Sequence, residues 1–542
     1  MIRLTEIKLP LAHPDTAIAD AVVRTLGIQA DELQSVHIFK LSFDARKAEL
    51  LQVYIVDVAL CSDALEAEVV SRFENNPHIR PTPDMVYKPV ASASAELKSR
   101  PVVVGFGPCG IFAALVLAQM GFKPIVLERG KKVRERTKDT WNLWRKNQLH
   151  PESNVQFGEG GAGTFSDGKL YSQIKDPRYL GRKVMQEFVK AGAPEEILVD
   201  AHPHIGTFKL VKVVEHLREQ IIALGGEVRF EQRVTDVRIE EGQLQGLTVL
   251  DVATQQSYEL PTQQTVLALG HSSRDTFAML YERGVYVEAK PFSIGFRIEH
   301  PQSLIDRARW GRHAGHPLLG AADYKLVHHA KNGRAVYSFC MCPGGTVVAA
   351  TSEVGRVVTN GMSQYSRNER NANAGIVVGI APEDFPSKHP LAGIELQRTL
   401  ESAAYVLGGS TYEAPGQLVG DFVKGMASTA LGSVAPSYKP GVKLVDLAAA
   451  LPSYAIEAIR EAIPAFGKKI KGFDLPDAVL TGVETRTSSP IKMTRGDDFQ
   501  SLNVRGLFPA GEGASYAGGI LSAGVDGIKV AEAVALSLLA QK

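Results

Sequence analysis

The sequence has little cysteine, no excess of either charge sign and no long hydrophobic run. Its 542 residues include 4 cysteines, 60 lysines and arginines, and 59 aspartates and glutamates. Four thiols are too few for a disulfide scaffold and fit a reducing compartment. Balanced charge provides no global field to attract nucleic acid or an anionic membrane. No window approaches the ~18 apolar residues of a membrane-spanning helix, and the first residues lack the apolar core of a signal peptide. We therefore expect a cytoplasmic protein that binds neither a membrane nor, on this charge balance, nucleic acid.

Metal ligation is also not indicated by the sequence. The histidines at positions 202, 204, 328 and 329 are potential ligands by type, but no acidic or cysteine partner stands at ligand spacing. We therefore predict no metal site.

The first ninety residues have the pattern of a separate α+β unit. Strand-like runs at 2–9, 37–43, 50–58 and 79–90 alternate with amphipathic helical stretches at 15–26 and 62–73. The order β-α-β-β-α-β predicts a ferredoxin-like domain over 1–92. A small, polar linker at 91–100 follows.

A glycine-rich turn after the buried run Val102–Val104 carries the first functional motif. The motif GxGxxG consists of Gly105, Phe106, Gly107, Pro108, Cys109 and Gly110. Its glycines suit a tight turn, close approach of the backbone to a pyrophosphate, and helix–strand packing, while the following helix presents its N-terminus to phosphates. Glu128, with Arg129 beside it, ends the next strand, where a carboxylate can accept hydrogen bonds from a ribose diol. The sequence predicts a Rossmann-type dinucleotide site here.

A second strand–glycine–helix unit closes the chain. It contains Gly511, Glu512, Gly518, Gly519 and Ile520. This ending resembles the second flavin motif of the glutathione-reductase-like FAD superfamily, and the proline in the first motif resembles a variant common among FAD enzymes. The resemblance implies FAD, with Glu512 on a ribityl hydroxyl and the helix near Gly519 directed at the flavin, where charge collects on reduction.

Three further segments fit the same superfamily. The loop 156–169 is rich in small residues, and its candidate cofactor contacts are Gly160, Gly161, Ala162, Gly163 and Thr164. Val234 lies where the superfamily often clamps the adenine, and Gly270 ends a strand like its middle motif. Together with FCMCPGG and VETRTSSP, these segments resemble a bacterial family of FAD-dependent dehydrogenases of uncertain substrate, distantly like the predicted NAD(FAD)-utilising dehydrogenases.

Three residues are candidates for catalysis. Cys340 and Cys342 could relay electrons as a dithiol, although a bridge between residues i and i+2 is strained. The alternatives are packing in a substrate pocket and an ordinary core role, since free cysteines are often core residues. Arg486 could place a cation near the flavin or an anionic substrate, and a structural salt bridge is the alternative.

We therefore expect an FAD-binding domain from 96–288 and 481–542, with an inserted substrate or cap domain at 289–480. The expected function is that of an FAD-dependent oxidoreductase passing a hydride through flavin N5 to or from a small organic substrate. Only one dinucleotide fingerprint is clear, so NAD(P)H would be a transient electron donor. The alternative is an FAD-containing RNA-modifying or partner-binding protein recruited by the N-terminal domain. The oligomeric state does not follow from the sequence.

Overall fold

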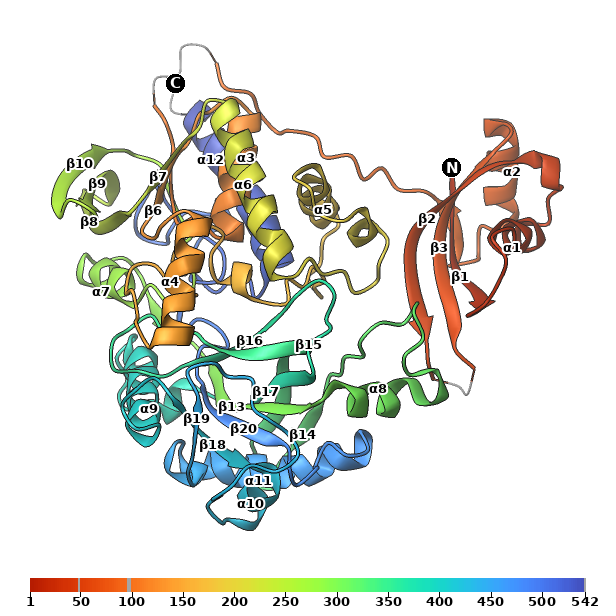
Figure 1. Ribbon diagram of the computed structural model, residues 1–542. Helices are drawn as coiled ribbons and strands as arrows, with labels where there is room; N and C mark the ends of the chain where they lie inside the picture. The colour runs from red at the N-terminus through yellow and green to blue at the C-terminus, as the bar shows by residue number, and fades with distance from the viewer. Residues whose placement is uncertain (47–48, 95–98, 541–542) are drawn as a thin grey trace. The chain divides into compact units, whose positions relative to one another are not determined.

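The computed structural model describes residues 1–46, 49–94 and 99–540, which form two compact units (Figure 1). The first unit comprises Met1–Tyr87 and Lys175–His204, and the second comprises Lys88–Ile174 and Ile205–Lys542. Part of the predicted linker at 91–100, and the predicted domain start at 96, lie outside the described residues. No described helix is both long and apolar enough to cross a membrane.

The first unit is built on a four-stranded antiparallel sheet in the order β2-β3-β1-β4, with α1 and α2 on one face (Figure 1). Its elements are β1 (Ile2–Pro10), α1 (Ala17–Leu26), the 3-10 helix η1 (Ala30–Glu32), β2 (Leu33–Asp44), β3 (Leu51–Leu60), α2 (Asp63–Arg72) and β4 (Ile79–Pro81). The Ser62 side chain caps α2 by accepting a hydrogen bond from Leu65 N. This topology confirms the predicted ferredoxin-like order, although the last strand is shorter than expected.

Residues 175–204, predicted to belong with the nucleotide-binding part, belong to the first unit instead. They form α5 (Leu180–Lys190) and the 3-10 helix η3 (Glu195–Leu198). Leu41 N donates to Val199 O at 2.8 Å, and Ala201 N donates to Leu41 O at 2.9 Å, so this segment pairs with the edge strand β2. A segment far away in sequence supplies these backbone partners, which local patterns do not reveal.

The second unit contains a five-stranded parallel sheet in the order β22-β11-β5-β6-β7. These strands are β5 (Val102–Val104), β6 (Ile125–Glu128), β7 (Glu227–Phe230), β11 (Thr265–Leu267) and β22 (Leu507–Pro509). In chain order this is 3-2-1-4-5, a strand order of the Rossmann-type fold that the sequence predicts. The strand order reverses between β5 and β11, and the crevice at such a switch point is where ligands bind in open α/β sheets.

Helices pack against the parallel sheet, and two of them lie in very close contact. The helices α3 (Pro108–Gln119), α6 (Thr207–Ala223) and α12 (Ile520–Ala540) run together in Figure 1. A Cβ at Gly527 would lie 2.3 Å from Cys109 O, so only glycine allows α12 to approach α3 this closely. The first and last helices of this part are thereby joined across more than four hundred residues.

An eight-stranded, largely antiparallel sheet forms most of the rest of this unit. Its order is β14-β15-β17-β13-β20-β18-β19, with β16 paired to β15, and only β18 and β19 run parallel. Its strands are β13 (Phe292–Pro301), β14 (Val327–His329), β15 (Ala335–Ala349), β16 (Thr359–Ser363), β17 (Asn371–Ile380), β18 (Ala414–Leu418), β19 (Val442–Leu444) and β20 (Val479–Glu484). Because β20 reaches Glu484, this sheet continues past the expected insertion end at 480.

Smaller elements complete the second unit. The helices are α4 (Val133–Lys146), α7 (Arg274–Glu282), α8 (Gln302–Trp310), α9 (Ala392–Leu407), α10 (Val419–Lys424) and α11 (Ser453–Lys469), and the 3-10 helices are η2 (Ala162–Phe165), η4 (Gly311–His313), η5 (Pro382–Asp384) and η6 (Leu447–Ala449). A meander joins β8 (Gln232–Glu240), β9 (Gln243–Asp251) and β10 (Gln256–Pro261), while β12 (Glu288–Ala289) pairs with β21 (Ile491–Lys492). The largest core cluster lies between the mixed sheet and its helices.

Candidate functional site

A cavity of about 580 Å³ opens at the carboxyl ends of β5, β6 and β11, at the switch point of the parallel sheet. One end is lined by the turn after β5 and by Glu128 at the end of β6. The other end reaches β15 of the mixed sheet, through Tyr337 to Met341. The cavity therefore joins the nucleotide-type sheet to the inserted sheet.

The turn after β5 requires glycine at positions where backbone atoms touch. Gly105 has a φ of +99°, and a Cβ there would lie 2.1 Å from Ala268 O. A Cβ at Gly110 would lie 1.9 Å from Gly105 O. Gly107 precedes Pro108, the first residue of α3, so the helix N-terminus opens onto the cavity as predicted.

A second glycine-rich loop lies directly on the first. Gly160 N donates to Phe106 O at 2.8 Å. A Cβ at Gly161 would lie 2.7 Å from the Cα of Gly107. The two backbones thus form one continuous small-residue wall, which leaves room for a flat or phosphorylated ligand on its open side.

A buried cation holds the second loop in place. Arg136 on α4 is fully buried and donates to five backbone carbonyls, those of Asn154, Val155, Gly158, Glu159 and Gly161. Burial lowers the pKa of this guanidinium to about 10, which still leaves it charged at neutral pH. Its planar fork reaches carbonyls that a single ammonium could not span.

The carboxylate of Glu128 links the two loops at the nucleotide end. It accepts hydrogen bonds from Phe106 N at 2.9 Å, Gly130 N at 2.8 Å and Gly158 N at 3.0 Å. The side chain also lines the cavity. A carboxylate has about four lone-pair positions, so three backbone donors leave capacity for a ribose hydroxyl. Arg129 lines the cavity too, with its guanidinium bound by Glu152 and Asp275.

The turn after β22 brings Glu512 to the cavity. Asp526 on α12 shapes this turn, accepting from Gly511 N at 2.8 Å while Arg495 pairs with it at 2.6 Å. The Glu512 side chain lines the cavity and makes no hydrogen bond within the described part of the chain. Burial, together with the nearby Cys340, raises the pKa of its carboxyl to about 7, against the opposing effect of Lys290.

Most of the predicted cofactor contacts line this one cavity. They are Gly105, Gly107, Pro108, Cys109, Glu128, Arg129, Gly161, Ala162, Gly163, Val234, Gly270, Glu512, Gly518, Gly519 and Ile520. Their individual contacts with a cofactor stay predictions. Burial raises the pKa of the Cys109 thiol well above its usual range, so Cys109 is a protonated packing residue.

Four predicted cofactor contacts do not line the cavity. Gly110 lies under the first turn, against Gly105 O, and Gly511 packs against the Cys109 side chain. Gly160 and Thr164 contact each other, since a Cβ at Gly160 would lie 2.1 Å from Thr164 Oγ1. These residues support the cavity wall from behind, and their small size permits the backbone contacts that form it.

The β15 end of the cavity carries the reactive side chains. Lys169, Tyr324, Tyr337, Cys340 and Asn360 all line it. Cys342, predicted as the second catalytic thiol, is fully buried and does not line the cavity. The Tyr324 hydroxyl is buried without a hydrogen-bond partner in the described residues, and burial raises its pKa far above the usual value. It is therefore a neutral donor with a free proton.

Arg486 lines the cavity, but its guanidinium is largely committed to a buried network. It pairs with Glu401 at 3.0 Å and donates to Ser272 Oγ and Ser352 Oγ. Arg274 binds the same Glu401 carboxylate at 2.6 Å. Burial and the two arginines lower the pKa of His271, which also lines the cavity, to about 3. The predicted catalytic role of Arg486 stays a prediction beside this structural one.

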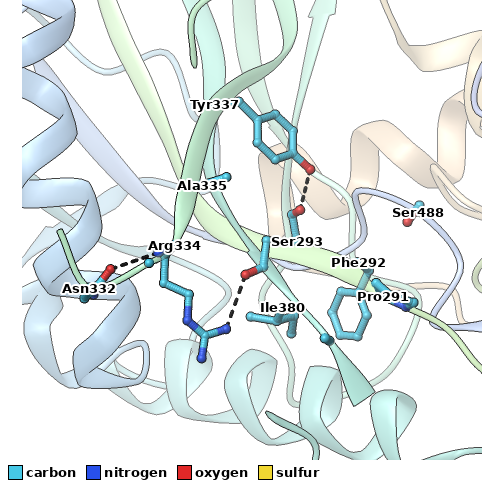
Figure 2. A pocket seen from close by; sticks show the side chains of 12 residues that line it. Pro291, Phe292, Ser293, Asn332, Arg334, Ala335, Tyr337, Ile380 and Ser488 are labelled. Atoms are coloured by element: carbon cyan, nitrogen blue, oxygen red, sulfur yellow. Dashed lines mark hydrogen bonds between the residues drawn. The ribbon is translucent and has the colours of Figure 1, made fainter. Parts of the chain in front are cut away.

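A second, more open pocket of about 470 Å³ lies beside the cavity, and Figure 2 shows its lining. Tyr337 borders both spaces. Its hydroxyl is directed at Ser293 and is hydrogen-bonded to Ser293 Oγ (Figure 2). This pair forms part of the wall between the two spaces.

Comparison with known proteins identifies the family. Residues 291–487 match the family described as FAD-dependent protein, C-terminal domain-like, and residues 1–59 match a domain of unknown function. A protein of Clostridium beijerinckii, described as uncharacterized, is 48% identical over 532 residues, which cover 98% of this chain and 98% of that protein.

Two solved structures resemble this chain only distantly. A geranylgeranyl bacteriochlorophyll reductase-like protein of Thermoplasma acidophilum is 13% identical, with 82% of this chain and 79% of that chain covered and a TM-score of 0.35. A 3-ketosteroid-delta4-(5alpha)-dehydrogenase of Rhodococcus jostii is also 13% identical, with 83% and 99% covered and a TM-score of 0.34.

The chain belongs to the same family as the clostridial protein, a family of FAD-dependent proteins, and its cofactor is FAD. The cavity fits this cofactor. Two helices begin at its wall, backbone contacts between glycines leave an open surface, and the Glu512 carboxyl has no partner in the described part of the chain. Helix N-termini favour phosphates, and a free carboxyl suits a sugar or ribityl hydroxyl.

Sequence reasoning missed several residues that shape the site. Arg136 lies on a helix with no motif around it, and its partners are backbone carbonyls 18–25 residues further along the chain. Asp526 lies on the C-terminal motif helix, but its partners Gly511 N and Arg495 are not marked by the motif. Tyr337 and Asn360 lie on β15 and β16 of the inserted sheet, where strand patterns are hard to recognise, and Tyr324 lies in the irregular segment before β14. For Lys169 a signal existed, because it ends the glycine-rich loop.

Replacement of Arg136 by lysine should weaken FAD binding without unfolding the protein. An ammonium cannot reach all five carbonyls, and charged hydrogen bonds contribute roughly 1.5–3 kcal/mol each, so we expect FAD affinity to fall at least about tenfold. Fluorescence titration of apoprotein with FAD measures this. The control is Arg134→Lys on the same helix, where the exposed guanidinium pairs with Glu215. Equal affinities for wild type and R136K would refute the role of Arg136.

The Glu512 carboxyl should make stability depend on pH. Its pKa is about 7 in the folded chain against an ordinary 4.5, so between these values the folded state binds a proton that the unfolded state has lost. Stability from this group therefore falls as pH rises through this window. In thermal melts of apoprotein, the melting temperature of Glu512→Gln minus that of wild type should rise from pH 4.5 to 7 and stay constant above pH 7. A difference independent of pH would contradict the assignment.

Proposed function

We propose that the protein is an FAD-dependent oxidoreductase that transfers a hydride through flavin N5 to or from a small organic substrate. The substrate would bind at the β15 end of the cavity. The observation that carries the proposal is that a single cavity combines a dinucleotide-type wall with a cluster of proton-donating and nucleophilic side chains. Bound FAD supplies two-electron chemistry, and the protein supplies binding, orientation and electrostatics.

Two features of the C-terminal motif, the start of α12 and the Glu512 carboxyl, would favour a reduced cofactor. The N-terminus of α12 presents backbone N–H groups and a positive dipole end toward the cavity. Glu512 has a pKa of about 7, raised first by burial, so its carboxyl can hold or release a proton near neutral pH. The positive helix end would stabilise negative charge that develops on a nearby reduced flavin. The Glu512 carboxyl would avoid adding to that charge while it holds its proton.

Two side chains at the β15 end favour a substrate with a carbonyl or carboxylate oxygen. Tyr324 offers a hydroxyl proton that has no partner in the described residues. Lys169 donates to Met341 O and keeps its charge, because Asp167 and the cysteines outweigh the effect of burial and raise its pKa. A neutral donor and a fixed cation facing one space can orient such an oxygen.

The electron partner would be NAD(P)H bound transiently or the organic substrate itself. Two stretches have GxGxxG spacing, residues 105–110 and 158–163. The first follows β5 and opens α3, the second lies in the loop packed against it, and both are assigned to the FAD site. A nicotinamide would therefore share the open side of the cavity and would not have a domain of its own.

Anaerobic reduction of the FAD-loaded protein tests the proposal. NADH, NADPH and a panel of small carbonyl, alcohol and carboxylate compounds are added in turn, and the visible flavin absorbance is followed. We expect at least one to bleach the flavin. If only dithionite bleaches it, the proposal fails.

With a productive donor, Tyr324→Phe should slow bleaching about tenfold, the value of one hydrogen bond of roughly 1.4 kcal/mol, while FAD content stays unchanged. Tyr286→Phe, on the surface of the second unit, is the matched control. A wild-type rate in Y324F would exclude a role for this hydroxyl.

A further inference from the structure

A bulge in β15 gives Cys340 and Cys342 an unusual spacing. Phe339 pairs with Gly375 and Cys342 pairs with Asn373, so one strand advances by three residues where its partner advances by two. Cys340 has a φ of +46° within this bulge. In a regular strand, side chains at i and i+2 are about 6.6 Å apart, too far for a sulfur contact. A bulge breaks that spacing and re-aims the side chain.

The bulge brings the two cysteines close together. The Cys342 thiol donates to Cys340 O at 3.4 Å, and the two side chains lie near enough to shift each other's pKa. Two cations fix the backbone between them. Arg297 Nη1 donates to Cys340 O at 2.8 Å, and Lys169 Nζ donates to Met341 O. The contact is thus held by buried groups and does not depend on a free loop.

The two thiols differ in access and in acidity. Cys340 lines the cavity, whereas Cys342 is fully buried beneath it. The hydrogen bond from Cys342 lowers the pKa of Cys340 below its usual range, with help from Arg297 and Lys169, and the same contact raises the pKa of Cys342. An accessible thiolate next to a protonated partner is the arrangement needed for reversible thiol–disulfide chemistry.

We propose that Cys340 and Cys342 form a redox-active dithiol that exchanges two electrons with the FAD cofactor in the shared cavity. The inference rests on the proposed function. In the oxidative direction, the Cys340 thiolate and the Cys342 thiol form one S–S bond, and one S–H bond breaks. Oxidised FAD accepts the electron pair and the single released proton. The reverse step returns the thiolate and the thiol.

The close spacing of this pair suits a relay and does not suit a permanent cross-link. A disulfide between residues i and i+2 departs from preferred geometry, and such departures make the bond easier to reduce. Both cysteines are free in the structure. The pair would therefore open and close with the redox state of its surroundings.

Anaerobic reductive titration of the FAD-loaded, oxidised protein tests the dithiol. Wild type should consume four electrons per FAD, whereas C340S and C342S should each consume two. The control is Cys61→Ser, an exposed thiol of the first unit, which should still consume four. Alkylation by N-ethylmaleimide in denaturant, so that the buried Cys342 is also reached, is done before and after titration and followed by mass spectrometry of the peptide containing residues 340–342. It should show both thiols blocked by oxidation at first and labelled afterwards.

The outcomes separate this inference from the proposed function. A protein that carries FAD and is bleached by an organic donor, but consumes only two electrons with both thiols labelled throughout, retains the function and loses the dithiol. If FAD cannot be loaded, the apoprotein can be equilibrated in thiol–disulfide buffers of known potential. Labelling of Cys340 and Cys342 with N-ethylmaleimide in denaturant then shows whether the two thiols form a disulfide. Full labelling of both cysteines in strongly oxidising buffer would then overturn the inference.

Discussion

The whole site depends on the contact between two glycine-rich backbones, the turn after β5 and the loop that continues into η2. Gly161 approaches Gly107 so closely that one added carbon would lie 2.7 Å from its Cα, and Gly160 N donates to Phe106 O. Without side chains the two loops merge into one thin wall. Because no side chain projects from the contacting glycines of this wall, a long, flat cofactor can lie along it and reach the inserted sheet.

That wall is kept in shape by charges buried behind it. Arg136 binds the carbonyls of the second loop, Glu128 binds amides from both loops, and Asp526 binds the turn that presents Glu512. Buried charges are costly unless they are fully hydrogen-bonded, and here each has several partners. The energy of these bonds orders segments that come from the first third and the last tenth of the chain.

The sequence predicted those parts of the molecule in which function itself dictates local residues. The glycines after β5, the acid at the end of β6 and the glycine-rich ending can be recognised because phosphate binding and tight turns allow few alternatives. The mixed sheet could not be read in the same way. Nine of the ten residues of β13 are buried, among them Arg297, Glu299 and His300, so neither alternation nor a purely apolar run marks it. Likewise, residues 175–204 join the first unit through backbone bonds to Leu41, which no local pattern encodes. The role of that first unit, including recruitment of a partner, stays a prediction.

The central claim is that three segments far apart in sequence enclose one FAD. Hydrogen–deuterium exchange of the apoprotein, with and without added FAD, tests it most directly. The account predicts that FAD slows exchange together in residues 105–110, 156–163 and 511–520, with one common dependence on FAD concentration. Protection confined to a single segment, or protection of the three at different concentrations, would contradict it.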